Sequence, residues 1–366
     1  MPEQNPVPWP DACKAPMRWP GTRPALTLLL MEPTLPTALT DAFQRRVNYV
    51  RLSVTDRCDF RCVYCMAEEM TFVPKADVLS LEELYQVAQA FTLLGVTKIR
   101  LTGGEPLVRS NVMSLVERVG RLPGLEQLAL TTNGSQLQRL SAALYGAGVN
   151  RINVSLDSLS PRKFRQLTRH GNLDQVIAGI DAAIATGFEG IKINAVILKG
   201  RNDNEVIDLV NFATARGVDI AFIEEMPLGL IDDHDRALTF CSSEELRQML
   251  APHFALSPEG DPAGNSGPAR YFTIDGSRTR IGFISPHSHN FCHLCNRVRV
   301  TAEGRLLLCL GNEHSVDLRA VLRAPDCSLE ALQWTIVKAM DIKPERHHFD
   351  HAQQPQILRF MNTTGG

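Results

Sequence analysis

Apolar runs long enough to span a bilayer, which takes about 20 residues in a helix, are missing from the sequence. Net charge is also nearly missing, because the 366 residues carry a formal charge of −2. A chain so close to neutral gives no overall electrostatic reason to bind nucleic acid. Its nine cysteines lack the spacing of a secreted disulfide scaffold. We therefore predict a globular cytoplasmic protein of one large or two ordinary domains, with neither nucleic acid nor a membrane as partner.

The first residues differ in composition from the rest of the chain. They are rich in proline and show little periodicity as far as Pro36. A short apolar run, 26–31, lacks the charged flank and small-residue cleavage site of a signal peptide. We predict that residues 1–38 are a disordered or non-native N-terminal extension, with Met31 as an alternative start.

From Tyr49 onward, strand-like and helix-like segments alternate. The strand-like runs are 49–54, 98–102, 127–131, 151–156, 190–196 and 219–224. Apolar residues between them recur at helical spacing; Leu84, Val87, Phe91 and Leu94 share one helical face. Alternating strands and helices predict an α/β fold with a parallel sheet, and six units fit either a barrel that does not close or a long open sheet.

Polar residues concentrate where these runs end. After the first four strands come the cysteine loop, the Gly-Gly-Glu-Pro sequence 103–106, the sequence 131–134, and Ser155 with Asp157. Lys192 and Asn194 lie on the fifth run, and 224–227 follow the sixth. The carboxyl ends of parallel strands form the ligand site of such folds, so we predict that the site lies there.

The first of these loops carries Cys58, Cys62 and Cys65, with the spacing C-x3-C-x2-C. Three thiolates can bind three irons of a cubane cluster and leave the fourth iron open to a small molecule. Zinc is the alternative, but a structural zinc site needs four closed ligands. Tyr64 is an aromatic residue that could cover a ligand at the open iron. Gly103 and Gly104 have two interpretations, as turn residues or as an approach for a ligand to the backbone.

A second cysteine set, Cys292, Cys295 and Cys309, has the spacing C-x2-C-x13-C. Neighbouring histidines make zinc a stronger alternative here. Arg297 and Arg299 alternate on a strand-like run, so their side chains share a face. Paired guanidinium groups suit polyphosphate, although a solvated face is the plainer interpretation.

Three cysteines outside these sets, Cys13, Cys241 and Cys327, are predicted to be ordinary thiols. The terminal Gly365-Gly366 is either a frayed end or a narrow tail that can enter a crowded pocket.

These motifs together resemble the radical S-adenosylmethionine superfamily and, within it, the GTP 3′,8-cyclases of molybdenum cofactor biosynthesis. The resemblance runs from about Leu39 to the C-terminus and is carried by 51–58, 98–106, 291–299 and the Gly-Gly end. It implies an incomplete (β/α)6 TIM-type barrel over 39–227. A C-terminal accessory region, 228–366, would carry a second iron–sulfur cluster and substrate-binding residues.

The resemblance also implies residue roles. The first cysteine set would hold a [4Fe–4S] cluster that binds S-adenosylmethionine, and the second set a [4Fe–4S] cluster that meets the guanine base. The positions matching S-adenosylmethionine ligands are Tyr64, Gly104, Ser155 and Met226. Those matching GTP ligands are Arg51, Arg100, Thr131, Lys192, Arg297 and Arg299, with Lys98 as a neighbouring charge. Catalytic roles fall to Arg297, Arg299, Gly365 and Gly366.

The implied reaction converts GTP to (8S)-3′,8-cyclo-7,8-dihydroguanosine 5′-triphosphate through a 5′-deoxyadenosyl radical. Implied partners are a flavodoxin-like or equivalent electron donor and a downstream cyclic pyranopterin monophosphate synthase, and a homodimer is compatible with the resemblance. Two alternatives stay open at this point: another radical enzyme with an auxiliary cluster, acting on a peptide, and a zinc-binding module without catalysis.

Overall fold

The computed structural model describes residues 34–229, 231, 234–260, 268–289, 291–347 and 357–365. Residues from Leu35 onward form one compact unit. Most of the predicted N-terminal extension, 1–33, lies outside the described residues. No helix within the described ranges is long and apolar enough to cross a membrane.

A twelve-stranded mixed sheet organises the unit, and its strand order is β14-β13-β12-β3-β4-β5-β6-β7-β8-β11-β10-β9. Its central strands are β3 (Tyr49–Ser53), β4 (Lys98–Thr102), β5 (Gln127–Thr132), β6 (Val149–Ser155), β7 (Gly190–Val196) and β8 (Asp219–Ile223). Each pairs in parallel with the next. All six predicted strands are therefore present, within about two residues of the expected ends.

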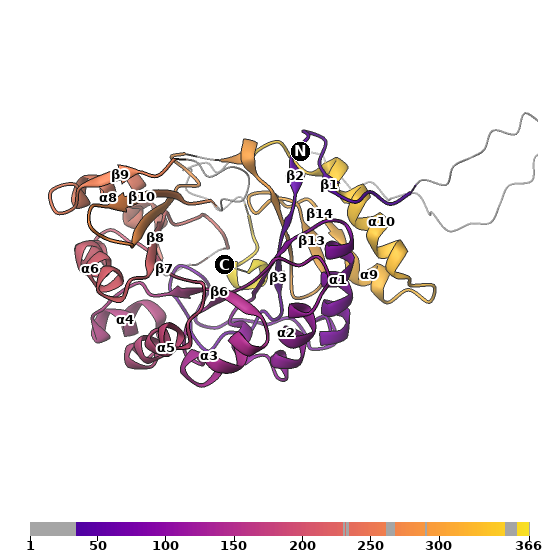
Figure 1. Ribbon diagram of the computed structural model, residues 1–366, viewed down its shortest axis with the longest axis horizontal. Coiled ribbons are helices and arrows are strands. Elements are labelled where there is room, and N and C mark those ends of the chain that lie inside the picture. The colour runs from indigo at the N-terminus through magenta and orange to yellow at the C-terminus, as the bar shows by residue number, and fades with distance from the viewer. Residues whose placement is uncertain are drawn as a thin grey trace, which may run out of the picture. The chain divides into compact units, whose positions relative to one another are not determined.

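Helices connect these parallel strands and lie along the outer side of the curved sheet (Figure 1). They are α1 (Leu81–Leu93), α2 (Val112–Gly120), α3 (Leu137–Gly146), α4 (Pro161–Thr168), α5 (Leu173–Thr186) and α6 (Val206–Arg216), with 3-10 turns at Pro106–Val108 and Asp203–Glu205. The α/β class is confirmed, with a partly barrel-like arrangement. Along the described residues β14 and β9 are the two edges, so the sheet does not close on itself.

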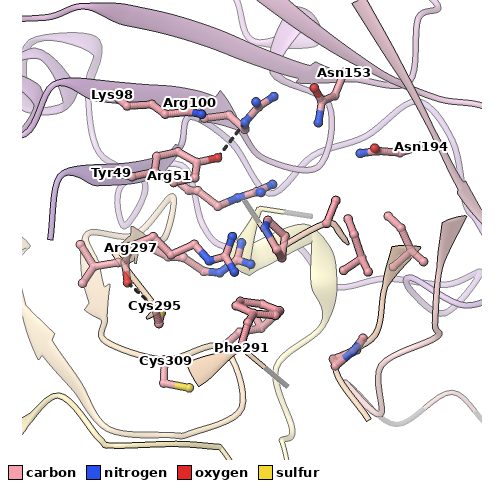
Figure 2. A pocket seen from close by; sticks show the side chains of 18 of the residues that line it. Tyr49, Arg51, Lys98, Arg100, Asn153, Asn194, Phe291, Cys295, Arg297 and Cys309 are labelled. Atoms are coloured by element: carbon pink, nitrogen blue, oxygen red, sulfur yellow. Dashed lines mark hydrogen bonds between the residues drawn. The ribbon is translucent and has the colours of Figure 1, made fainter. Parts of the chain in front are cut away.

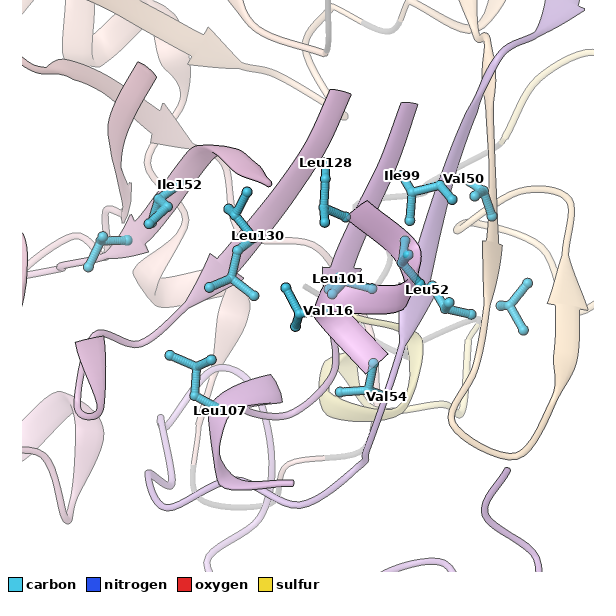
Figure 3. Close-up of a cluster of buried hydrophobic side chains, with 14 of the residues drawn as sticks. Val50, Leu52, Val54, Ile99, Leu101, Leu107, Val116, Leu128, Leu130 and Ile152 are labelled. Atoms are coloured by element: carbon cyan, nitrogen blue, oxygen red, sulfur yellow. The ribbon is translucent and has the colours of Figure 1, made fainter. Parts of the chain in front are cut away.

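Period-two alternation in the strands separates an apolar face from a polar one. Val50 and Leu52 on β3 and Ile99 and Leu101 on β4 are fully buried, and they pack toward α2 together with Val116 (Figure 3). Burying one such side chain contributes about 1.5–3 kcal/mol. The intervening residues of the same strands point to the opposite face, inside the curve, and that face is the one available to a ligand.

The C-terminal residues extend this sheet on both sides, which the sequence interpretation did not anticipate. Strand β12 (Arg297–Val300) pairs in parallel with β3, and β11 (Arg280–Ile284) pairs in parallel with β8. Antiparallel strands then follow: β13 (Arg305–Leu307) and β14 (Ser315–Asp317) on one side, β10 (Arg270–Ile274) and β9 (Leu256–Pro258) on the other. A small separate hairpin joins β1 (Leu39–Thr40) to β2 (Arg46–Val47).

The remaining helices follow β8 in the sequence, and the last of them lies inside the curve of the sheet. They are α7 (Arg236–Thr239), α8 (Ser243–Leu250), α9 (Leu318–Leu322), α10 (Leu329–Ala339) and α11 (Met361–Thr364), with 3-10 turns at Cys292–Leu294 and Met340–Ile342. Figure 1 shows the yellow C-terminal helix near the middle of the unit, and Arg299 on β12 hydrogen-bonds the Gly365 carbonyl. Helix α11 therefore lies on the face where the predicted site residues lie.

Candidate active site

The first cysteine loop follows β3 directly. Cys58, Cys62 and Cys65 are all half-buried, and none is in a disulfide. The thiol of Cys58 accepts a hydrogen bond from the Phe60 amide at 3.3 Å, and the amide of Cys65 donates to the Cys62 carbonyl at 3.0 Å. Burial raises the pKa of all three thiols. Without a cation to bind, these groups stay protonated at neutral pH.

Gly103 and Gly104 fit the backbone of this loop. A Cβ at Gly103 would lie 2.4 Å from the Thr55 carbonyl oxygen, and one at Gly104 2.4 Å from the Arg57 carbonyl oxygen. The amide of Gly104 donates to the Thr55 carbonyl at 2.8 Å. The space opened by the two missing side chains is thus occupied by the chain that leads into Cys58. The group that approaches this pair is the protein's own backbone, while approach of a ligand to it stays a prediction.

Glu105, next in the motif, ties the end of β4 to the end of β5. Its side chain is fully buried and accepts hydrogen bonds from the Thr132 hydroxyl at 2.9 Å and the Asn133 amide at 2.6 Å. Burial raises the pKa of this carboxyl to about 8. The motif therefore fixes two neighbouring strand ends as well as the cysteine loop.

Tyr64 points across to β6. Its hydroxyl donates to an Asp157 carboxylate oxygen at 2.7 Å, and the other oxygen accepts from the Val196 amide at 2.8 Å. Burial raises the pKa of Asp157 to about 6. Asp157 therefore holds the tyrosine between the cysteine loop and the sheet.

The second cysteine set lines a cavity of about 560 Å³ inside the curve of the sheet. Cys292 begins a 3-10 turn, Cys295 ends it, and Cys309 follows β13. In Figure 2, Cys295 and Cys309 lie on one side of the space, with Phe291 beside them. The Arg297 guanidinium lies over the Phe291 ring, 4.8 Å from its centroid.

Arginines from separate strands line up across the sheet and face the same cavity. Register pairs Arg299 with Arg51, Arg51 with Arg100, Arg100 with Ala129, and Ala129 with Arg151. Residues in register on parallel strands point to the same face. We call Arg299, Arg51, Arg100 and Arg151 the arginine row. All four line the cavity.

Two further rows of side chains flank the arginine row. Arg297 is in register with Tyr49, and Tyr49 with Lys98. On the other side, Thr131 is in register with Asn153, and Asn153 with Lys192. Of the predicted GTP ligands, Arg51, Arg100, Lys192, Arg297 and Arg299 line the cavity. Thr131 is not among the lining residues, but its hydroxyl accepts a hydrogen bond from Arg100 at 3.3 Å. Figure 2 shows Arg51, Arg100 and Arg297 extending toward the same space.

Positive charge dominates this cavity. Burial, with Arg51 and Arg297 close by, lowers the pKa of Arg299 well below its usual value, and burial lowers that of Arg51 to about 10. Burial lowers the pKa of Lys98 to about 8. Buried charges of one sign are costly without a counter-charge. The cavity is therefore built for an anion with several negative charges.

The last helix and the glycine that follows it contact both the first cysteine loop and the arginine row. The Asn362 side chain donates to the Asp56 carbonyl at 2.8 Å, and its backbone hydrogen-bonds the thiol of Cys65. Arg299 donates to the Gly365 carbonyl at 2.6 Å. Gly365 has a φ of 74°, and a Cβ there would lie 2.0 Å from the Thr102 hydroxyl. Gly366 lies outside the described residues.

Of the four predicted S-adenosylmethionine ligands, one lines the cavity and the other three lie at strand ends or in loops outside its lining. Met226 lines the cavity. Ser155 ends β6, Gly104 follows β4, and Tyr64 lies in the cysteine loop. All four are at carboxyl ends of strands or in the loops that follow, as expected, while their contacts with a ligand stay a prediction.

Two groups of residues escaped the sequence interpretation. Arg151 lines the cavity, yet a single arginine on a strand is typical of a solvated face. The small residues that flank it in register, Ala129 and Gly190, could have pointed to it. Lys343 and His347 contact the second cysteine set, and no pattern near them suggests a ligand site.

Comparison with known proteins first identifies the class. Residues 52–213 match the model of the radical SAM superfamily, and residues 218–349 match the model described as Molybdenum Cofactor Synthesis C. The chain is thus a radical S-adenosylmethionine protein, a class that implies one [4Fe–4S] cluster together with S-adenosylmethionine.

Close relatives then identify the particular family. The GTP 3′,8-cyclase of Pseudomonas entomophila (strain L48) is 61% identical over 332 residues, which cover 90% of this chain and 99% of that protein. The GTP 3′,8-cyclase of Marinobacter nauticus (strain ATCC 700491 / DSM 11845 / VT8) is 62% identical over 330 residues, with the same coverage. The chain belongs to the GTP 3′,8-cyclase family.

Solved structures support the fold independently. A crystal structure of Streptococcus suis SuiB has a TM-score of 0.56 and 13% identity, covering 85% of this chain and 68% of that one. SuiB bound to S-adenosylmethionine has a TM-score of 0.52 and 13% identity, covering 84% and 77%. At this identity the likeness concerns the fold alone.

Each cysteine set fits an iron–sulfur cluster by its donor chemistry. Thiolate is the usual protein ligand of such clusters, and each set offers three thiols outside any disulfide. Within the described residues, no group of three or more His, Cys, Asp or Glu side chains surrounds a point that could hold one metal ion.

Proposed function

We propose that the protein converts GTP to (8S)-3′,8-cyclo-7,8-dihydroguanosine 5′-triphosphate, the first step of molybdenum cofactor biosynthesis. The observation that carries the proposal is the arginine row, which faces the same cavity as Cys292, Cys295 and Cys309. This arrangement offers cations for a triphosphate and an iron site for a base at two parts of one cavity. Family membership supports the same activity.

Two [4Fe–4S] clusters complete the proposed site. Cys58, Cys62 and Cys65 would hold the cluster that binds S-adenosylmethionine, with Tyr64, Gly104, Ser155 and Met226 as further ligands. Cys292, Cys295 and Cys309 would hold a second cluster next to the guanine base. When bound, the first cluster and S-adenosylmethionine supply the 5′-deoxyadenosyl radical that takes hydrogen from C3′ of the ribose.

The protein's own residues fix the nucleotide. Ring closure between C3′ and C8 needs the base and the triphosphate to be fixed at opposite ends. Arg51, Arg100, Arg299 and Lys192, assisted by Thr131, would bind the phosphates, since guanidinium groups pair bidentately with phosphate oxygens. Such positioning can lower a barrier by roughly 7–11 kcal/mol. The position inside the curve of the sheet also limits access of water to the radical.

The partners follow from this chemistry. An electron donor, flavodoxin-like or equivalent, would reduce the clusters, and a cyclic pyranopterin monophosphate synthase would receive the product. A peptide substrate is the competing proposal for this class of enzyme, but the buried arginine row favours a polyphosphate.

Tyr49 provides a test of the anion site that does not depend on turnover. Burial alone would raise its pKa, but Arg100, Arg51, Lys98 and Arg297 together lower it to about 6. Arg100 also donates to its hydroxyl at 2.8 Å. In cluster-free protein we expect one tyrosinate absorbance change centred near pH 6. Inorganic triphosphate should move it upward, because bound phosphates offset the arginine charges.

The control is Tyr145→Phe, which removes an exposed tyrosine and should leave the change intact, whereas Tyr49→Phe should abolish it. An absorbance change that persists in Tyr49→Phe, or whose midpoint pH does not move with triphosphate, would contradict the proposed anion site.

The activity itself is tested by anaerobic incubation of reconstituted protein with GTP, S-adenosylmethionine and dithionite. We expect 5′-deoxyadenosine and the cyclised nucleotide, identified by mass spectrometry. Cleavage of S-adenosylmethionine with candidate peptides but not with GTP would favour the peptide-modifying alternative. Zinc without sulfide in anaerobically purified protein would favour a binding module instead.

A further inference from the structure

The short segment Lys343–His347 lies next to the second cysteine set. Two of its side chains place a nitrogen atom in contact with sulfur atoms of that set. Lys343 lies immediately after the 3-10 turn Met340–Ile342 and is buried, with its side chain 2% exposed. Its ammonium group donates to the sulfur of Cys295 at 3.6 Å. The Nδ1 atom of His347 lies 3.1 Å from the sulfur of Cys292. His347 also hydrogen-bonds the thiol of Cys309, so all three sulfurs in this set contact a basic side chain.

The other nitrogen of His347 contacts a backbone carbonyl. Nε2 lies 3.0 Å from the Pro286 carbonyl oxygen, which can only accept, so Nε2 carries a proton. The His347 ring therefore spans the Pro286 carbonyl and the Cys292 sulfur, while Lys343 presents an ammonium group to the Cys295 sulfur.

The segment is held in place by Arg45, in the turn between β1 and β2. Its guanidinium donates to the carbonyls of Pro344 and Glu345, at 2.7 and 2.6 Å. It also donates to the Cys292 carbonyl at 2.7 Å and pairs with Asp41 at 2.7 Å. One arginine thereby links the segment and the cysteine turn to a buried carboxylate.

The first cysteine set has different surroundings. Its sulfurs are contacted by the backbone amides of Phe60 and Asn362. The carboxylates of Asp59 and Asp157 lie close to it. Reduction adds negative charge to a cluster, so nearby cations favour the reduced state and nearby carboxylates oppose it. Near the first set, the Arg61 guanidinium reaches the Cys58 carbonyl at 2.6 Å, so the contrast between the sets lies in the groups that contact the sulfurs themselves.

We propose that the Lys343 ammonium and the His347 ring, positioned by Arg45, form a shell of side chains on the ligand sulfurs that makes the second cluster easier to reduce than the first. The inference rests on the proposed second cluster. As a consequence, the first cluster has the lower reduction potential of the two and is the stronger reductant. Hydrogen bonds and charges around cluster sulfurs are known determinants of reduction potential.

The test is a redox titration of the anaerobically reconstituted enzyme, monitored by electron paramagnetic resonance without GTP. We expect the second cluster to have the higher midpoint potential. Lys343→Met, which keeps the apolar stem, should lower that potential so that the oxidised-to-reduced ratio at a fixed potential changes roughly tenfold, about 59 mV for one electron. The potential of the first cluster should not change.

Controls separate charge from structure. Lys338→Met removes an exposed lysine on α10 and should change neither potential, while Lys343→Arg should largely restore the unaltered value. Lys343 also pairs with the Asp41 carboxylate at 3.9 Å, so His347→Gln provides a second variant outside this ion pair, should Lys343→Met fail to fold. It should lower the same potential.

Two results would overturn the proposal: a second cluster that is not the easier one to reduce, or potentials unaffected by both Lys343→Met and His347→Gln. Iron analysis keeps this outcome apart from failure of the proposed function. About eight irons per chain show that both clusters are present, whereas about four in the unaltered protein would refute the second cluster itself.

Discussion

Arg297→Ala is expected to abolish most GTP conversion while leaving both clusters in place. The guanidinium lies over the Phe291 ring in the wall that holds Cys295, and its strand is in register with Tyr49 on β3. Removing one partner of a buried charged contact costs about 2–5 kcal/mol, which corresponds to a loss in kcat/KM of roughly 30-fold to several thousandfold. The measurement is product formation under anaerobic conditions, with iron and sulfide content determined on the same sample.

A suitable control is Arg270→Ala, because Arg270 is an exposed arginine that also lies on a strand, β10. It should retain the unaltered rate and the same iron content. Normal GTP conversion by Arg297→Ala would remove Arg297 from the site. Loss of iron in that variant would instead assign Arg297 to the stability of the cluster loop.

Deletion of Gly365 and Gly366 is the second change with a large expected effect. The Gly365 carbonyl accepts from Arg299 at 2.6 Å, and Gly365 packs against Thr102 at the end of β4. The tail thus contacts both the arginine row and the strand that leads into Gly103. Losing a hydrogen bond to a charged group costs about 1.5–3 kcal/mol, so product formation should fall at least about tenfold.

Folding should survive this deletion, because the buried core side chains lie on the strands and on earlier helices. Thermal unfolding of the truncated protein checks this. Thr363→Ala is the matched control, since its hydroxyl makes a local bond to the Phe360 carbonyl, and it should work at the normal rate. A truncated enzyme with full activity would mean that the tail is only a frayed end.

Patterns among neighbouring residues predicted the individual strands and helices of the central sheet. The six central strands and their helices follow from alternation and helical spacing, which are properties of neighbouring residues. The arginine pair on β12 was also predicted, because residues two apart on a strand share a face. The resemblance then assigned roles to both cysteine sets and to most of the cations, and the structure gathers those cations and the second cysteine set around one cavity.

The rest depends on contacts between distant segments. Nothing near 297–300 or 280–284 indicates that these strands add to opposite sides of the central sheet, because parallel partners are far apart in sequence. Arg151 joins the arginine row only through register with Ala129. Lys343 and His347 reach the cysteines only because Arg45, about 300 residues earlier, holds their segment.

The two added strands have a consequence for folding during synthesis. Until the ribosome has made β11 and β12, β3 and β8 are unpaired edge strands, and such edges favour association with other chains. Relief comes only with β11 and β12, near residues 280–300. A fragment that stopped at residue 227 would leave β3 and β8 as unpaired edge strands, so we expect it to aggregate when it is made alone.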